Sequence, residues 1–150
     1  MNPIGVLNGF GHCKLFTGAP EGAIAALEQA IRISPRDQQI GLLYFQMGRV
    51  HLLQSRVDEA IYWLEKARSA MPEPVYVHAF LASAYGLKGD TEHAAVELEE
   101  ARRLGGKDSL SSLARMKAGL SRTYFDVPKV RDWFEATYLA GLRQAGVSEE

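Results

Sequence analysis

The residues of this chain best suited to metal or nucleophilic chemistry are four histidines and one cysteine. Cys13 follows His12 directly, and the other histidines stand alone at positions 51, 78 and 93. Neighbouring residues of a helix point about 100° apart, and no H-E-x-x-H spacing or second His–Cys pair completes a metal site. A reactive thiol needs a positioned base and a lowered pKa, which nothing near Cys13 supplies. We therefore expect no metal site, and a thiol that packs as a small apolar group.

Glycines and carboxylates are the next candidates for chemistry. Gly5, Gly9 and Gly11 do not follow a strand, and no Lys-Ser/Thr pair follows them, so they do not form a phosphate-binding loop. The carboxylates of "EHAAVELEEARR" stand three or four residues from basic side chains, which is typical of a solvated helix face. We expect no catalytic residue and no cofactor, and a protein that is not an enzyme.

Charge and hydropathy exclude several partner classes. Seventeen basic and eighteen acidic residues give a formal charge of −1, so no overall field attracts nucleic acid or an anionic membrane. No apolar run is long enough to span a membrane, and "MNPIGVLNGFGHCKL" lacks the order of a secretion signal. A single cysteine agrees with a reducing compartment. These features predict a cytoplasmic protein with protein partners.

One segment, residues 101–122, is locally basic, with six basic residues and a single acid, Asp108. The basic residues are Arg102, Arg103, Lys107, Arg115, Lys117 and Arg122. They are interpreted as a solvated helix end, where cations complement the helix dipole. The alternative is a surface for nucleic acid or an acidic partner.

Small residues recur along the chain with a fixed period. The spacing of Gly48, Ala60 and Ala67 returns 34 residues later as Ala82, Ala94 and Ala101, and 37 residues earlier as Gly11, Ala23 and Ala30. Leu64 and Pro72 of the central copy also have counterparts in other copies. The pattern resembles the tetratricopeptide repeat, a helix-turn-helix unit of 34 residues. The resemblance implies an all-α fold, a right-handed superhelix of three hairpins plus C-terminal capping helices.

The predicted boundaries follow from this period and from helix punctuation. A single domain over 1–150 contains repeats at about 4–37, 41–74 and 75–108 and a cap at 109–150. The expected helices cover 4–16, 20–33, 38–54, 57–70, 74–88, 91–104, 109–119 and 127–144. Pro20 begins a helix, Asp37 and Asp90 act as N-caps, and Gly146 ends the last helix. Gly48 is predicted to face Ala60, because two helices approach closely only where side chains are small.

The last predicted helix carries an apolar stripe at helical spacing, which indicates a cap over the open face of the final repeat. Its residues are Val130, Trp133, Phe134, Tyr138 and Leu142.

In stacked repeats the first helix of each pair lines a concave surface, where a partner is expected. The predicted groove residues are Asn8, His12, Leu42, Phe45, Arg49, Tyr76, Ala79 and Ser83. Aromatic anchors with a few hydrogen-bonding groups suit a peptide or helix of a partner protein. Only Arg49 is a permanent cation, which disfavours the carboxylate tail of a chaperone. The alternative is that Phe45 and Tyr76 complete the core.

The chain is also similar to the repeat-bearing C-terminal region of bacterial adenylate or guanylate cyclase-like proteins. The similarity lies in the segments "EQAIRISPRD", "YFQMGRVHLLQSRVDEAIYWLEKA" and "GLRQAG". The catalytic half of those proteins is absent here, so cyclase activity is not expected. The leading hypothesis is a non-catalytic interaction module that binds a protein segment in its groove. The alternatives are a homodimer, formed through the array ends or the Trp133 helix, and a regulatory module related to such cyclases.

Overall fold

The structure, a computed structural model, describes residues 14, 19–106, 110, 112–120 and 127–150, with the backbone alone described for 117–120. This part of the chain is helical and contains no strand, as the sequence predicts. The helices are α2 (Pro20–Ile33), α3 (Ile40–Leu53), α4 (Val57–Ala70), α5 (Val75–Lys88), α6 (Thr91–Gly105), α7 (Leu113–Leu120), α8 (Pro128–Phe134), the π-helix η1 (Glu135–Leu139) and α9 (Ala140–Ala145). The predicted helix over 4–16 lies outside the described residues, apart from Lys14.

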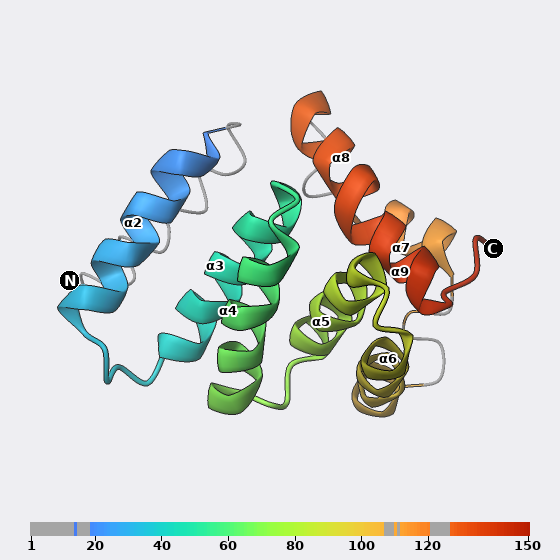
Figure 1. Ribbon diagram of the computed structural model, residues 1–150, viewed down its shortest axis with the longest axis horizontal. Helices are drawn as coiled ribbons and strands as arrows, with labels where there is room; N and C mark the ends of the chain where they lie inside the picture. The colour runs from blue at the N-terminus through green and yellow to red at the C-terminus, as the bar shows by residue number, and fades with distance from the viewer. Residues whose placement is uncertain (1–13, 15–18, 107–109, 111, 121–126) are drawn as a thin grey trace.

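The helices pack in sequence-adjacent pairs, as expected for hairpin repeats. Helix α3 packs on α4 and α5 packs on α6, while α2 contacts α3 and α4 contacts α5. Figure 1 shows the pairs side by side, in an arc from α2 to α6. Because each pair covers the apolar face of the next, a continuous core runs through all of them.

Gly48 marks the closest approach of α3 and α4. A Cβ atom at this position would lie 2.5 Å from Cγ of Leu64 and 3.2 Å from the backbone oxygen of Ala60. Ala60 and Leu64 are both fully buried. The predicted contact between Gly48 and Ala60 is confirmed, and Leu64 fills the space that the missing side chain leaves.

Two predicted helix starts are confirmed and one is wrong. Pro20 begins α2, and the carboxylate of Asp90 caps α6 by accepting the backbone N–H of His93 at 3.2 Å. Asp37 does not cap α3, which begins at Ile40. Its carboxylate accepts the N–H of Gln39 at 2.8 Å, in a turn that precedes the helix. A short acidic side chain favours such local bonds, and this turn lies between the first two copies of the pattern, which are 37 residues apart and not 34.

The C-terminal helix is continuous from Pro128 to Ala145 and contains a π-turn in its middle. Gly146, with a φ of 107°, ends it in the left-handed conformation, as the sequence predicts. A π-turn disturbs the regular backbone pairing. At this turn the hydroxyl of Ser83, on α5, donates to the carbonyl of Tyr138 at 2.8 Å, which joins the C-terminal helix to the repeat core.

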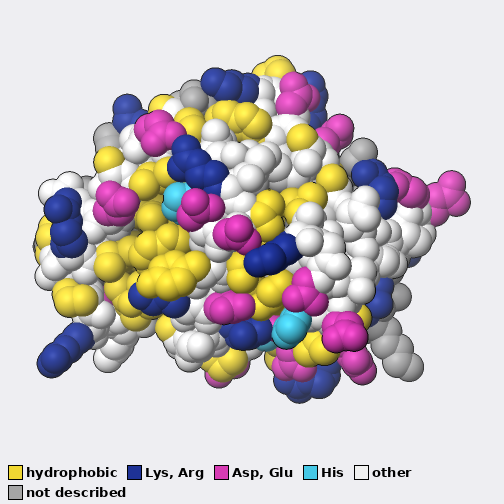
Figure 2. Space-filling model, in the orientation of Figure 1, with side chains coloured by type: hydrophobic (Ala, Val, Ile, Leu, Met, Phe, Trp, Pro, Cys, Tyr) yellow, Lys and Arg dark blue, Asp and Glu magenta, His cyan; other side chains and the backbone are white. Residues whose placement is uncertain are grey.

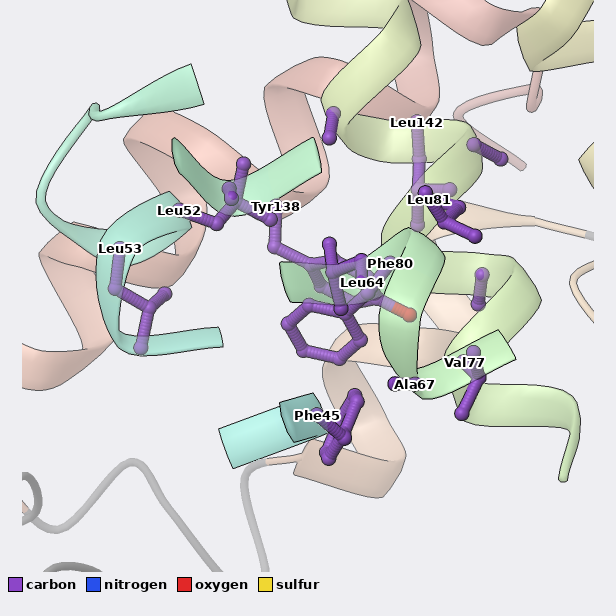
Figure 3. Close-up of a cluster of buried hydrophobic side chains, with 14 of the residues drawn as sticks. Phe45, Leu52, Leu53, Leu64, Ala67, Val77, Phe80, Leu81, Tyr138 and Leu142 are labelled. Carbon is purple, nitrogen blue, oxygen red and sulfur yellow. The ribbon is translucent and has the colours of Figure 1, made fainter. Parts of the chain in front are cut away.

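The C-terminal helix covers α5 and α6, where the sequence places it, and it also reaches α3. Val130, Phe134, Tyr138 and Leu142 of the predicted stripe are buried, and Trp133 is half-buried. In Figure 3 Tyr138 and Leu142 lie among side chains of the hairpins, including Phe80 and Leu81.

Two glycines allow this helix to approach α5 at backbone distance. A Cβ atom on Gly86 would overlap the backbone oxygen of Gly141, and a Cβ atom on Gly141 would overlap the backbone oxygen of Ser83. The smaller helix α7, predicted at 109–119, begins at Leu113. Its first amides donate to carbonyls of the C-terminal tail, at Ser148 (2.8 Å) and Glu149 (3.0 Å).

Candidate functional site

The predicted groove residues differ widely in their exposure. Asn8 and His12 lie outside the described residues. Tyr76 is 42% exposed and Leu42 is half-buried. Phe45, Arg49, Ala79 and Ser83 are buried. Of the predicted groove positions that the structure describes, only Tyr76 and Leu42 therefore keep accessible surface.

Ser83 shows why the groove is closed over the third repeat. Its hydroxyl is bonded to the Tyr138 carbonyl, and its backbone lies against Gly141. The chain's own C-terminal helix thus takes the place that the prediction reserved for a partner. Sequence reasoning placed this helix at the end of the array and did not foresee that it crosses toward α3.

Arg49 also differs from its predicted role. Only 5% of the residue is exposed, its guanidinium donates to the side-chain oxygen of Gln46, and it lies 5.8 Å from the ring centre of Phe45. We expected it to offer hydrogen bonds to a partner. Instead Arg49 is one of the buried residues of α3.

A chain of aromatic rings connects the exposed surface to the core. The rings of Tyr76 and Phe45 are 4.6 Å apart, Phe45 and Phe80 are 5.2 Å apart, and Phe80 stacks on Tyr138 at 4.1 Å. Phe134 continues the series 6.1 Å beyond Tyr138. Of the two alternatives for Phe45 and Tyr76, the structure places Phe45 in the core and leaves the Tyr76 ring accessible at the outer end.

A buried polar cluster, missed in the sequence, joins the second and third pairs. Glu97 on α6 is 4% exposed, pairs with Arg68 of α4, and lies 2.6 Å from Nδ1 of His78. Nε2 of His78 lies 2.7 Å from the carbonyl of Pro72. We call Arg68, His78, Glu97 and Pro72 the polar clasp. Because both ring nitrogens of His78 already face acceptors, this histidine is engaged in structure and not aimed at a substrate.

The position of Glu97 corrects the prediction that "EHAAVELEEARR" is entirely a solvated face. Glu97 stands three residues after Ala94 and four before Ala101, both fully buried. This spacing put Glu97 on the inner face of α6 and was the signal available in the sequence. Nearby, Tyr85 donates to Glu65, and burial followed by this bond raises the pKa of the Tyr85 phenol.

His51 is a buried histidine with an altered pKa. Burial, followed by the charge of Arg56, lowers the pKa of His51, whose buried Nδ1 has no hydrogen-bond partner.

Within the described ranges no three His, Cys, Asp or Glu side chains converge as a metal site would require. Cys13 lies outside those ranges. No helix in the described part of the chain has the length and apolar character that crossing a membrane requires.

Comparison with known proteins bears on the repeat. The tetratricopeptide repeat profile matches residues 4–37, the first copy found in the sequence. A mutant O-GlcNAc transferase from Thermobaculum terrenum is similar in structure, with a TM-score of 0.65 and 19% sequence identity. The fold is a tetratricopeptide-repeat superhelix. The match covers 89% of this chain and 26% of the transferase chain, so this chain corresponds to about a quarter of that protein.

A comparison with curated proteins found no similar sequence. The resemblance to cyclase-like proteins therefore stays a prediction. Within the tetratricopeptide-repeat fold, the predicted groove positions keep an accessible aromatic side chain at the edge formed by Leu42, Phe45 and Tyr76. We call these three residues the concave patch.

Proposed function

We propose that this chain is a non-catalytic interaction module that binds a peptide or helix of a partner protein at the concave patch. The observation that carries the proposal is the state of Tyr76. Tyr76 is 42% exposed, and its ring packs against the buried ring of Phe45, with 4.6 Å between the ring centres. An exposed aromatic ring that loses little side-chain freedom on binding is the type of residue that anchors interfaces.

The surroundings of Tyr76 favour a ligand with apolar character. Leu42 is half-buried on the neighbouring helix, and the cation predicted for this surface, Arg49, is buried. The proposal keeps Asn8 and His12 as further groove residues, on the basis of their repeat positions. It also places the protein in the cytoplasm, with no cofactor and no metal.

The experiment is site-specific photo-crosslinking in the source cell. A benzophenone side chain replaces Tyr76 in one variant and Val96, 64% exposed on α6, in a matched control. We expect a defined partner adduct from position 76 and none from position 96, with competition by excess unlabelled wild-type protein but not by its Leu42→Glu variant. Equal adducts from both positions would refute binding at the concave patch.

Two alternatives have their own readouts. A homodimer through the array ends or the Trp133 helix predicts a mass that rises with concentration in light scattering, and adducts between two copies of the chain. A regulatory module related to nucleotide cyclases predicts a calorimetric signal with ATP or GTP. If the protein stays monomeric at all concentrations and gives no calorimetric signal with nucleotides, both alternatives are excluded.

A further inference from the structure

Three aromatic rings converge on the side chain of Lys66 where α3 meets α4. The ammonium group lies 4.7 Å from the ring centre of Tyr44, 5.3 Å from that of Tyr62 and 5.2 Å from that of Trp63. All three are within the distance of about 6 Å at which an aromatic face attracts a cation. We call Tyr44, Tyr62 and Trp63 the aromatic cage.

The cage rings support one another. The ring centres of Tyr44 and Trp63 are 5.8 Å apart, and those of Tyr62 and Trp63 are 5.2 Å apart in an edge-to-face arrangement. Tyr44 comes from α3, while Tyr62 and Trp63 come from α4 one turn before Lys66. The tight packing of α3 on α4 at Gly48 therefore holds the cage together.

Rings, and not a carboxylate, accommodate the Lys66 charge. Among the ion pairs of the described residues, none joins Lys66 to an acidic side chain. The ammonium group thus marks the point where the electron-rich faces of three rings favour positive charge.

The cage adjoins open space that a ligand can enter. A pocket of about 570 Å³ is lined by Tyr44, Tyr62, Glu65, Lys66, Arg68, Ser69 and Ala70. Tyr62 is 55% exposed, so one wall of the cage faces solvent. The one other cation of this lining, Arg68, is paired with Glu97, and Glu65 adds a carboxylate. The charged side chains around this pocket, apart from Lys66 itself, therefore do not repel a cationic ligand.

The third ring of the cage, that of Trp63, faces α2 rather than this pocket. Trp63 is not in the lining of the 570 Å³ pocket and instead lines a smaller one, of about 300 Å³, with Glu28, Ile31 and Arg32 of α2. In Figure 2 hydrophobic side chains gather over α2 and α4. The cage is therefore bordered by apolar surface, which lowers the local dielectric constant and strengthens cation–π attraction.

Lys66 can leave the cage at small cost, because a lysine stem is flexible and its ammonium group is readily solvated. A quaternary ammonium group has no N–H groups to lose from water, and its methyl groups contact ring faces directly. It therefore gains more from the cage than a primary ammonium does.

We propose that the aromatic cage binds a quaternary ammonium group, with Lys66 as the internal cation that the ligand displaces. The chemistry is shared by choline-type small molecules and by trimethylated lysine in a protein. The site is separate from the concave patch, and the proposal does not depend on the proposed function.

The experiment uses the full chain carrying Trp133→Phe, which leaves Trp63 as the sole tryptophan of the two in the sequence. Trp63 fluorescence is followed while choline chloride or its neutral isostere, 3,3-dimethylbutan-1-ol, is added. We expect a saturable change with choline and at least about fivefold weaker binding of the isostere, because only choline carries the charge. A trimethyl-lysine peptide is titrated in the same way, and the tighter of the two cationic ligands identifies the source.

The variants test the cage itself. Lys66→Met removes the internal competitor and is expected to strengthen choline binding about tenfold. Lys88→Met, at an exposed lysine paired with Asp58, is the matched control and is expected to have no effect. Tyr62→Leu changes a residue that is mostly exposed, so the fold is retained while binding is expected to be lost.

The outcomes separate this proposal from the proposed function. Tyr76→Glu should leave choline binding unchanged, since Tyr76 does not belong to the cage. Equal affinity for choline and the isostere would show a merely apolar pocket, and the absence of saturation in both wild type and Lys66→Met would show no site. Either result overturns the proposal.

Discussion

Single residues without bulk decide how closely the helices of this protein approach one another. Gly22, Gly48 and Gly141 all lie within helices, but a Cβ atom would meet a different neighbour at each. At Gly22 it would lie 3.2 Å from the flexible side chain of Lys14, and at Gly48 it would press on the buried Leu64. The same substitution is therefore expected to have opposite effects at different sites.

Gly48→Ala should lower the free energy of unfolding, and Gly22→Ala should raise it. Alanine gains about 1 kcal/mol in helix propensity at either site. At Gly48 overpacking costs about 1–3 kcal/mol, because Leu64 is fully buried and has little room to move. Urea denaturation of the two variants measures the difference, and stabilisation by Gly48→Ala would contradict the close contact of α3 and α4.

His51 should make stability depend on pH. Burial, then the charge of Arg56, places its folded-state pKa below the usual 6.5, so the folded protein holds a neutral ring. The unfolded chain takes up the proton first as the pH falls. The contribution is therefore fully present above about pH 6.5 and is lost as the pH falls through 6.5 toward the folded-state pKa.

Urea titrations of wild type and His51→Leu, at about pH 7.5 and pH 5.5, test this dependence. The loss of stability at the lower pH should be smaller in the variant, which has no proton to bind. An identical loss in both proteins would show that His51 is not the group responsible.

Two aspartates that both precede a helix in the sequence have different roles at the helix start. Asp90 caps α6, whereas Asp37 bonds within the turn before α3. The polar clasp joins whole helices, because Arg68, His78 and Glu97 come from α4, α5 and α6. It links three helices across the boundary between two repeats.

Asp90→Ala should lower the thermal midpoint by about 2 to 4 °C, and Asp37→Ala by less. The Asp90 carboxylate accepts the backbone N–H of His93 in the first turn of α6, and this bond lowers the pKa of Asp90. The contribution is present above the usual Asp pKa and is lost as the pH falls through the lowered value. Calorimetric scans of both variants at neutral pH measure it; equal shifts would refute the difference in roles.

Glu97→Gln should destabilise the protein by about 2–4 kcal/mol. The change leaves Arg68 and His78 without their shared carboxylate, although the partial exposure of Arg68 moderates the loss. Glu100→Gln, which breaks an exposed pair with Arg103 on the same helix, is the matched control and should have no measurable effect. Chemical denaturation distinguishes the two.

For the whole molecule, the C-terminal helix is as much a part of the core as the repeats are. It closes the third-repeat side of the concave surface through Ser83, Tyr138 and the crossing of Gly86 with Gly141. Of the described groove positions, this closure leaves Leu42 and Tyr76 of the concave patch accessible.

Gly141→Ala should displace the C-terminal helix and cost about 1–3 kcal/mol, because the new Cβ atom would meet backbone that has no alternative position. Trp133 fluorescence in a Trp63→Phe background should shift to the red, with increased binding of a hydrophobic dye. A native-like spectrum and unchanged stability would show that the helices do not cross at this glycine.

The sequence by itself determined the helices, their pairing and the small residues between them. A 34-residue period in Gly48, Ala60 and Ala67 reflects contacts between neighbouring helices, which local spacing encodes. The surface properties did not follow in the same way. Burial of Ser83 depends on the C-terminal helix, whose Tyr138 is 55 residues away in the chain, and no local pattern records where that helix comes to lie.

Only the tertiary structure decided which side chains are available. It turned Asp37 away from α3, buried Glu97 between His78 and Arg68, and brought Tyr44 from α3 against Tyr62 and Trp63 of α4. The physical reason is that helix formation depends on neighbouring residues, while exposure and charge pairing depend on everything that packs against a residue.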